Sequence, residues 1–412
     1  MSDDWTSAQR LAFRIGVVYL ALFCLATQIS GSLIPNPWFS YRGLGRVSPM
    51  RGITHWVAQT VFAIDVPLDD VSGGETLFFW IQWSWVLAAA IAITGVWTLL
   101  AKRRSYDAWL PGLRVVVRLV LAASLLEYGM TKVIPTQFPA PPLTALVTPV
   151  GDTTLSALLW TTIGSAPAYQ VVTGCIEVLA GVLLLLPRTV TLGALLALAS
   201  LAQVLLLNLT FDIGVKLVTT HLIVLAIILV VPMVRLKPDT TLAVRLKADT
   251  TRTVAIVLIA FGAYLLGMQT WINWSFWQVG GGGRPKSALY GIWNVERLSV
   301  DGGAGPTESN DYDRRWRRVI FDDPNTVVFQ RTDGSFARYG ASIDRGSGTV
   351  AITKGNSRTW ASRFTFDRPG DDRLSLDGEM DGHRIQAELR LVDRSAFPLL
   401  NSGFRWVRPH EP

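Results

Sequence analysis

The chain has 412 residues, half of them hydrophobic, and a formal net charge of +7 at pH 7. This length accommodates two or three domains. Cys24 and Cys175 are the only cysteines, which excludes a disulfide framework, a CxxC redox pair and a thiolate metal site. Because the basic excess lies mostly in loops between apolar segments, anionic lipid headgroups suit this charge better than nucleic acid.

Seven apolar segments precede residue 284, and each is long enough to cross the ~30 Å hydrocarbon core of a bilayer as a helix. They cover residues 15–34, 77–100, 113–134, 168–187, 189–211, 215–234 and 253–272. The chain is therefore predicted to be a multi-pass protein of a bacterial-type inner (cytoplasmic) membrane, with the lipid bilayer as its first partner.

The basic residues of the short loops predict the orientation, since cytoplasmic loops carry an excess of Lys and Arg. Lys102, Arg103 and Arg104 follow the second segment and Arg188 follows the fourth, whereas residues 136–169 contain neither Lys nor Arg. This pattern indicates a cytoplasmic N-terminus and an extracytoplasmic C-terminal domain.

The connecting segments have patterns of their own. Residues 53–63 and 153–164 place apolar side chains on one helical face and are predicted to be short interfacial helices. Residues 234–251 read VRLKPDTTLAVRLKADTT, a near-exact duplication that is too polar to pack. We interpret it as a flexible basic cytoplasmic loop without an assigned function. The glycine-rich sequence GGGGRPKS after the seventh segment is a flexible tether.

Residues 284–412 are predicted to form an extracytoplasmic β domain. Alternating apolar residues, interrupted by turn signals such as Asp333-Gly334 and Asp381-Gly382, indicate about eight strands in a meander, which is enough to close a small antiparallel barrel. Gly291-Ile292-Trp293 resembles the Gly-x-Trp opening of lipocalins, in which the Trp plugs the base of the barrel. A solid core is the more frequent outcome for a small barrel, and a ligand-binding barrel is the alternative.

Ionisable side chains within the apolar segments need a local explanation, because burying a charge in hydrocarbon is costly unless it is paired or reaches water. Glu177 lies near the middle of the fourth segment, and Gly174 and Gly181 on the same face allow a close helix neighbour. Under the predicted orientation, Arg118 lies toward the cytoplasm. Six titratable residues lie in the outer half of the bundle: Glu127, Lys132, Glu177, Asp212, Lys216 and His221.

Two interpretations of these residues remain open. A proton-handling or polar-ligand pocket requires several titratable groups in one region of low dielectric, where their mutual fields shift pKa values. Structural ion pairing between helices accounts for the same residues. Gln203 and Asn208, near the outer end of the fifth segment, would contribute polar contacts to such a pocket.

The sequence RLVLAASLLEYGMTKV, with Arg118, Gly129 and Lys132, is followed by EVLAGVLLLLP, with Glu177 and Gly181. Together they resemble the first two helices of the four-helix DoxX/DoxD-like membrane proteins. Some DoxD-type members are subunits of a thiosulfate:quinone oxidoreductase, so the resemblance implies a quinone-associated or redox-associated membrane subunit with a redox partner. The sequence contains no haem ligand pair, iron–sulfur cysteines or dinucleotide glycine loop, so any electron carrier is quinone itself or a partner's cofactor.

The predicted domains are residues 1–112 with two spans and an outer loop, 113–234 as the DoxX-like core, 235–252 as the duplicated loop, 253–283 as the seventh span and tether, and 284–412 as the β domain. The leading hypothesis is a quinone pocket in the outer half of the bundle. Its candidate catalytic residues are Glu177, His221 and Lys132, and its candidate ligand-binding residues are Arg118, Glu127, Gln203, Asn208, Asp212 and Lys216.

Two alternatives belong to other functional classes. A non-catalytic carrier or sensor would take up an apolar ligand through the β-barrel. A structural scaffold for a membrane complex would hold its polar residues in tight, sealed ion pairs.

Overall fold

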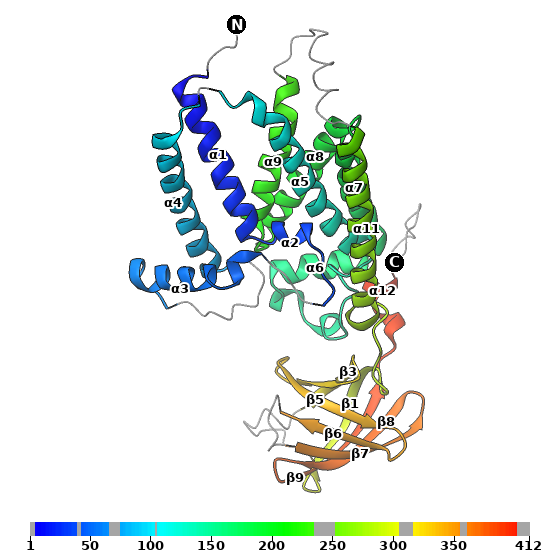
Figure 1. The fold of residues 1–412 in the computed structure, drawn as a ribbon. Helices are drawn as coiled ribbons and strands as arrows, with labels where there is room; N and C mark the ends of the chain where they lie inside the picture. Colours follow the sequence, from blue (N-terminus) through cyan, green and yellow to red (C-terminus); the bar gives the residue numbers. More distant parts are fainter. Residues whose placement is uncertain are drawn as a thin grey trace. The chain divides into compact units, whose positions relative to one another are not determined.

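The computed structural model describes residues 5–38, 43–65, 75–103, 105–234, 252–304, 316–354 and 361–401 (Figure 1). The chain divides into two compact units. The first, Met1–Gln137 with Ala168–Phe276, is called the helical unit below; the second, Phe138–Pro167 with Trp277–Pro412, is called the barrel unit. Apart from Arg252, the duplicated loop lies outside the described residues.

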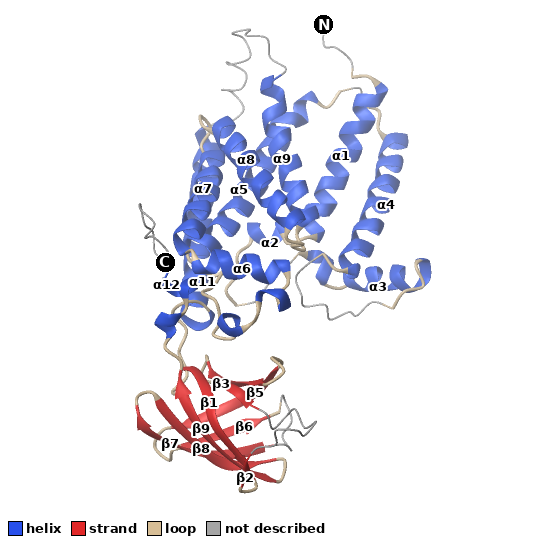
Figure 2. Cartoon of the chain, turned by 180° about the vertical axis from the view of Figure 1, so that it is seen from behind, coloured by secondary structure: helices blue, strands red, loops and turns tan. Residues whose placement is uncertain are grey.

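The predicted fold class, a helical bundle followed by an antiparallel β-barrel, is confirmed (Figure 2). In the described part of the chain, six helices are long and apolar enough to cross a membrane. They are α1 (Ser7–Ala26), α4 (Leu77–Leu100), α5 (Leu110–Val133), α7 (Pro167–Leu185), α8 (Val190–Thr210) and α11 (Arg252–Gly280). The remaining helices of this unit are α2 (Ile29–Leu33), α3 (Met50–Val61) and α9 (Lys216–Val234). Helix α9, the predicted sixth span, is apolar but shorter in its described portion.

The first span differs most from its predicted limits. Helix α1 begins at Ser7 instead of residue 15, because Thr6 and Gln9 form a capping box that satisfies the first backbone N–H groups in a polar stretch. It ends at Ala26, where the Thr27 hydroxyl donates back to the Phe23 carbonyl, and α2 follows as a separate short helix. Hydropathy detects only the apolar part of such a helix, so it misses a polar first turn.

Helices α5 and α7 cross at very short range. An added Cβ at Gly129 would lie 2.9 Å from the Gly174 carbonyl oxygen, and one at Gly174 would lie 2.7 Å from the Gly129 carbonyl oxygen. Only glycine permits this approach, as the spacing of small residues predicted. The close contact fixes how the polar side chains of the two helices meet.

The barrel consists of eight antiparallel strands in meander order: β1 (Gly291–Val300), β3 (Trp316–Phe321), β4 (Thr326–Arg331), β5 (Phe336–Asp344), β6 (Thr349–Thr353), β7 (Ala361–Gly370), β8 (Arg373–Met380) and β9 (His383–Leu391). Pairing of β1 with β9 closes it, and the two-residue β2 (Gly303–Ala304) extends β1. The predicted turn at Asp381-Gly382 is present, with both residues at positive φ.

Apolar side chains occupy the interior of the barrel. Trp316 lies against Phe329, with ring centroids 4.3 Å apart, and both belong to one buried cluster. Trp293 is 1% exposed, its indole donates to the Leu289 carbonyl, and the Arg368 guanidinium lies 5.7 Å from its ring centroid. These contacts are those of a packed core.

The connection between α5 and α7 packs on the outside of the barrel, which the sequence did not indicate. Leu143 is buried in a cluster with Ile292, Ile320 and Val328, whose side chains lie on the outer faces of β1, β3 and β4. The Leu143 N–H donates to Asp322 Oδ2 over 3.1 Å, and Arg284 pairs with the other oxygen of Asp322 over 2.7 Å. Helix α6 (Leu155–Ser165) belongs to the same unit.

Candidate functional site

Lys132 and Glu177 form a buried ion pair between α5 and α7. Lys132 Nζ lies 2.6 Å from Glu177 Oε2, and the two residues are 7% and 2% exposed. The ammonium also donates to the Tyr128 carbonyl over 3.3 Å. The Gly129–Gly174 crossing lies beside this pair and holds the two backbones together. At these two residues the structure therefore shows ion pairing between helices, one of the two interpretations that the sequence left open.

Other polar side chains of α5 face α2. The Ser32 hydroxyl, 1% exposed as a residue, donates to the Glu127 carboxyl, and the Gln28 amide donates to the Tyr128 hydroxyl. Tyr128 connects these contacts to the ion pair, because its backbone carbonyl accepts from Lys132. Three of the predicted residues, Glu127, Lys132 and Glu177, thus belong to one group, which we call the α5 polar cluster: Gln28, Ser32, Glu127, Tyr128, Lys132 and Glu177.

His221 belongs to a different set of contacts. Its Nδ1 lies 2.7 Å from the Leu217 carbonyl and its Nε2 lies 2.6 Å from the Tyr19 hydroxyl, which accepts from the Trp83 indole over 2.8 Å. A carbonyl only accepts, so Nδ1 carries the proton, and a neutral ring then accepts from Tyr19 at Nε2. The ring also stacks on Phe23, with centroids 3.6 Å apart. With a neutral His221, every hydrogen-bonding group in this series of contacts is satisfied. We call the series Trp83–Tyr19–His221 the His221 chain; it joins α1, α4 and α9.

The turn between α8 and α9 accounts for the remaining polar residues of that region. Asp212, at positive φ, pairs with Lys216 over 2.7 Å; its side chain is 89% exposed. The hydrogen bond from Lys216 lowers the pKa of Asp212. Buried Asn208 donates to the Thr219 hydroxyl over 3.0 Å. Gln203 is exposed and donates to Tyr169 over 3.3 Å.

An acidic side chain that the sequence reasoning missed holds the start of α9. The Glu75 carboxyl accepts the Leu217 N–H, and the Glu75 N–H donates to the Gly214 carbonyl over 2.7 Å. A distant carboxyl thereby caps the first turn of α9. Burial raises the pKa of Glu75, and the backbone N–H groups that it accepts oppose that rise.

Arg118, on α5, binds backbone carbonyls at the C-terminal end of α7. Its Nε donates to the Leu184 carbonyl over 3.0 Å and a terminal nitrogen reaches the Leu185 carbonyl over 3.5 Å. Carbonyls at a helix end lack intrahelical partners and carry negative partial charge, so a buried cation there is stabilising. Arg118 is far along α5 from Lys132 and does not join its cluster.

These contacts do not bring the predicted residues into the single polar pocket expected from the sequence. The nine predicted residues divide among the α5 polar cluster, the His221 chain, the Asn208–Thr219 contact, the exposed Asp212–Lys216 and Gln203 contacts, and the α7 end held by Arg118. Tyr19, Trp83, Gln28 and Ser32 were missed. Tyr19 and Trp83 are polar side chains in the mostly apolar helices α1 and α4, which is a usable signal, whereas Gln28 and Ser32 belong to the short α2 and its N-cap.

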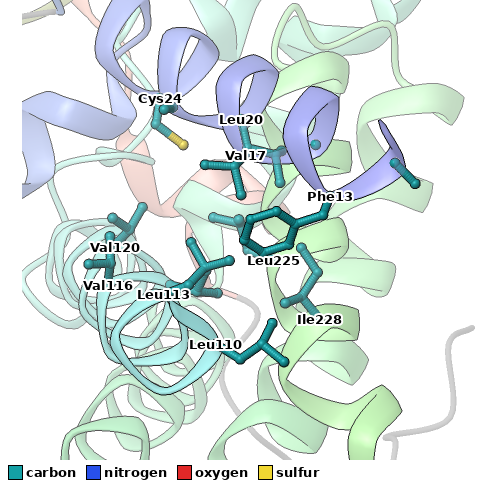
Figure 3. Close-up of a pocket in the computed structure, with 14 residues that line it drawn as sticks. Phe13, Val17, Leu20, Cys24, Leu110, Leu113, Val116, Val120, Leu225 and Ile228 are labelled. Atoms are coloured by element: carbon teal, nitrogen blue, oxygen red, sulfur yellow. The ribbon is translucent and has the colours of Figure 1, made fainter. Parts of the chain in front are cut away.

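A groove lies between α1, α5 and α9 in the helical unit (Figure 3). Its volume is about 340 Å³. Hydrophobic side chains from the three helices point into a common space, with the Cys24 thiol among them: Val17 and Leu20 from α1, Leu113 and Val116 from α5, and Leu225 and Ile228 from α9. None of the described residues that line the groove is charged, in contrast to the polar pocket expected.

The His221 chain lies just beyond one end of this groove. Leu225 lines the groove and is one helical turn from His221 on α9. Phe23, which is 1% exposed and stacks on His221, is adjacent in the chain to the lining residue Cys24. The groove and the His221 imidazole are therefore close neighbours along both α1 and α9.

The helices and the barrel together define a multi-pass membrane protein with a C-terminal antiparallel β-barrel. No protein-family model matches the chain, and no solved structure matches it. A stretch of 115 residues is 37% identical to the uncharacterized protein YwoB of Bacillus subtilis (strain 168), covering 27% of this chain and 71% of YwoB. The chain belongs to the family of YwoB. The name of that relative specifies no activity.

Proposed function

We propose that the helical unit is a membrane subunit that binds an amphipathic molecule of the quinone class, with the apolar chain of the molecule in the α1–α5–α9 groove. The observation that carries the proposal is the groove itself, whose volume of about 340 Å³ falls within the range of small-molecule sites. The assignment to quinone rests on the resemblance of residues 113–234 to DoxX-like proteins.

The dimensions of the groove suit a chain better than a compact ligand. Leu110 and Val120, both lining residues on α5, are separated by about 15 Å of helix at 1.5 Å per residue. If the apolar chain of the ligand lies along this wall, the head group of the ligand is directed toward Phe23 and His221. The Tyr19 hydroxyl and the His221 imidazole are then the nearest groups that can donate to or accept from a ring carbonyl.

The α5 polar cluster has a different part in this proposal from the one expected. Lys132 and Glu177 bind one another, and Arg118 binds the α7 carbonyls. We assign these three residues to stability and keep His221 as the residue that would contact the head group. Binding is proposed; a catalytic step is not.

The proposed orientation keeps the N-terminus cytoplasmic and the barrel extracytoplasmic. The packing of Leu143 against the barrel supports part of it, since residues 138–167 and the barrel must face the same side of the membrane. Under this orientation the groove opens toward the cytoplasmic half. Protease treatment of right-side-out and inverted vesicles tests it: cleavage of the barrel only in inverted vesicles would contradict the orientation.

Gly16 offers a direct test of the groove. It lines the groove, and a Cβ there would meet nothing within 4 Å, so Gly16→Leu fills the space without a clash. Gly95 on α4 is equally open and does not line the groove, so Gly95→Leu is the matched control. In nanodiscs, Gly16→Leu is expected to weaken binding of a menaquinone or ubiquinone analogue at least tenfold, with Gly95→Leu unchanged. Equal binding by both variants and the parent would refute the groove proposal.

A scaffold for a membrane complex is the second candidate, because the sealed Lys132–Glu177 pair is the feature expected of it. The same experiment separates the two. A scaffold without a ligand would bind no quinone analogue above the level of empty nanodiscs, whatever residue stands at position 16.

A further inference from the structure

The charges of the α5 polar cluster do not balance. The cluster contains two carboxyl groups, Glu127 and Glu177, but one ammonium group, Lys132. In a membrane-embedded bundle, a carboxylate without a cation is costly, and neutralisation by a proton is the usual alternative. The question is which carboxyl holds the proton.

The geometry assigns the ammonium to Glu177. Lys132 Nζ is 2.6 Å from Glu177 Oε2 and donates a second hydrogen bond to the Tyr128 carbonyl. The Gly129–Gly174 crossing brings the two backbones into close contact beside this pair. Glu177 therefore forms the ion pair with Lys132, as in other buried salt bridges.

Glu127 faces the opposite side of α5, toward α2. Its described partner is the hydroxyl of Ser32, and within the described residues no Lys, Arg or His bonds to its carboxyl. A hydroxyl both donates and accepts. Ser32 can therefore donate to an ionised Glu127 and accept from a protonated one, so this contact survives both states.

We propose that Glu127 is a proton-binding site of the helical unit, which takes up and releases one proton while remaining bonded to Ser32. Its carboxyl bonds to Ser32 of α2, and the other members of the α5 polar cluster are Gln28 just before α2, Tyr128 and Lys132 on α5, and Glu177 on α7. Uptake of the proton neutralises the excess negative charge and leaves the Lys132–Glu177 pair intact. The site does not depend on the proposed quinone groove.

Paired substitutions distinguish Glu127 from Glu177. The amide of Glu127→Gln resembles a protonated carboxyl, so this variant should keep the melting temperature of the parent at neutral pH. Glu177→Gln removes the counter-charge of buried Lys132 and should lower the melting temperature markedly. The measurement uses the full chain in nanodiscs. A loss in Glu127→Gln as large as that in Glu177→Gln would overturn the proposal, because Glu127 would then be a paired carboxylate.

Infrared difference spectra between low and high pH report the proton directly. The carbonyl stretch of a protonated carboxyl should titrate in the parent protein and be absent from the spectrum of Glu127→Gln. In Glu127→Asp the shorter side chain moves the carboxyl away from Ser32. This variant should restore the carbonyl band, with a changed midpoint of its pH titration. A titrating band that persists unchanged in Glu127→Gln would show that another group binds the proton.

Discussion

The buried pair between α5 and α7 allows a quantitative test of whether Lys132 and Glu177 are structural. Lys132→Met removes the ammonium and leaves Glu177, 2% exposed, without its partner 2.6 Å away. Breaking one side of a buried pair costs about 3–5 kcal/mol, because a charge remains in a poorly solvated place. In a unit of this size, each kcal/mol lowers the melting temperature by about 2–4 °C.

The double variant Lys132→Met, Glu177→Leu removes both charges and keeps apolar bulk between the helices. Replacing both members of a buried pair in this way is often neutral or stabilising. The double variant is therefore expected to recover most of the stability that Lys132→Met loses, which gives a coupling energy of about 3 kcal/mol in a double-mutant cycle. Quinone-analogue binding should also be retained.

Reversible unfolding in mixed micelles measures the four members of the cycle, and nanodisc binding measures the ligand. The exposed Asp212–Lys216 pair, also 2.7 Å long, is the control, and Lys216→Met should cost no more than about 1 kcal/mol. The reasoning fails if the double variant is as unstable as the single one. It also fails if the double variant is stable but no longer binds, since the pair would then act on the ligand.

Two further predictions concern the turn after α8 and the barrel. The pKa of Asp212 is lowered in the folded protein, so its small stabilising effect is present above the ordinary Asp pKa and disappears as the pH falls through the folded value. Comparing melting temperatures of the parent and Asp212→Asn across acid pH checks this, and a difference that grows toward low pH would contradict it. Asp322→Ala should destabilise the barrel unit by about 2 kcal/mol, since Arg284 and the Leu143 N–H both lose their acceptor. Cleavage between residues 138 and 152 should accelerate, while Glu388→Ala, whose pair with Arg297 is exposed, should change little.

Uniform apolar runs and glycine spacing predicted much of the fold. Helix α4 has the predicted limits, because Thr76 and Ala101 mark its ends in sequence as well as in space. Gly174 and Gly181 predicted a close helix neighbour for α7, and α5 packs closely against both glycines. The polar first turn of α1 was missed, since its stability comes from capping and not from hydropathy.

The candidate site was harder to predict, because its contacts depend on how helices rotate about their axes. Tyr19 reaches His221 across 202 residues and Trp83 reaches Tyr19 across 64, so no local pattern connects them. Helix α8 is almost uniformly apolar, so its sequence does not indicate which face turns inward. The single amide of Gln203 did not decide this, and in the structure Gln203 is exposed. The stacking of Phe23 on His221 likewise became visible only in the packed structure.

The contact between Leu143 and the barrel has a consequence for how the chain matures. Leu143 and its partner Asp322 are 179 residues apart, so the ribosome completes the α5–α7 connection long before it makes β3. Until then, the apolar side chain of Leu143 has no strands to cover it. Such distant pairings form late and slowly, and nascent chains halted before β4 should expose this segment to chaperones and proteases.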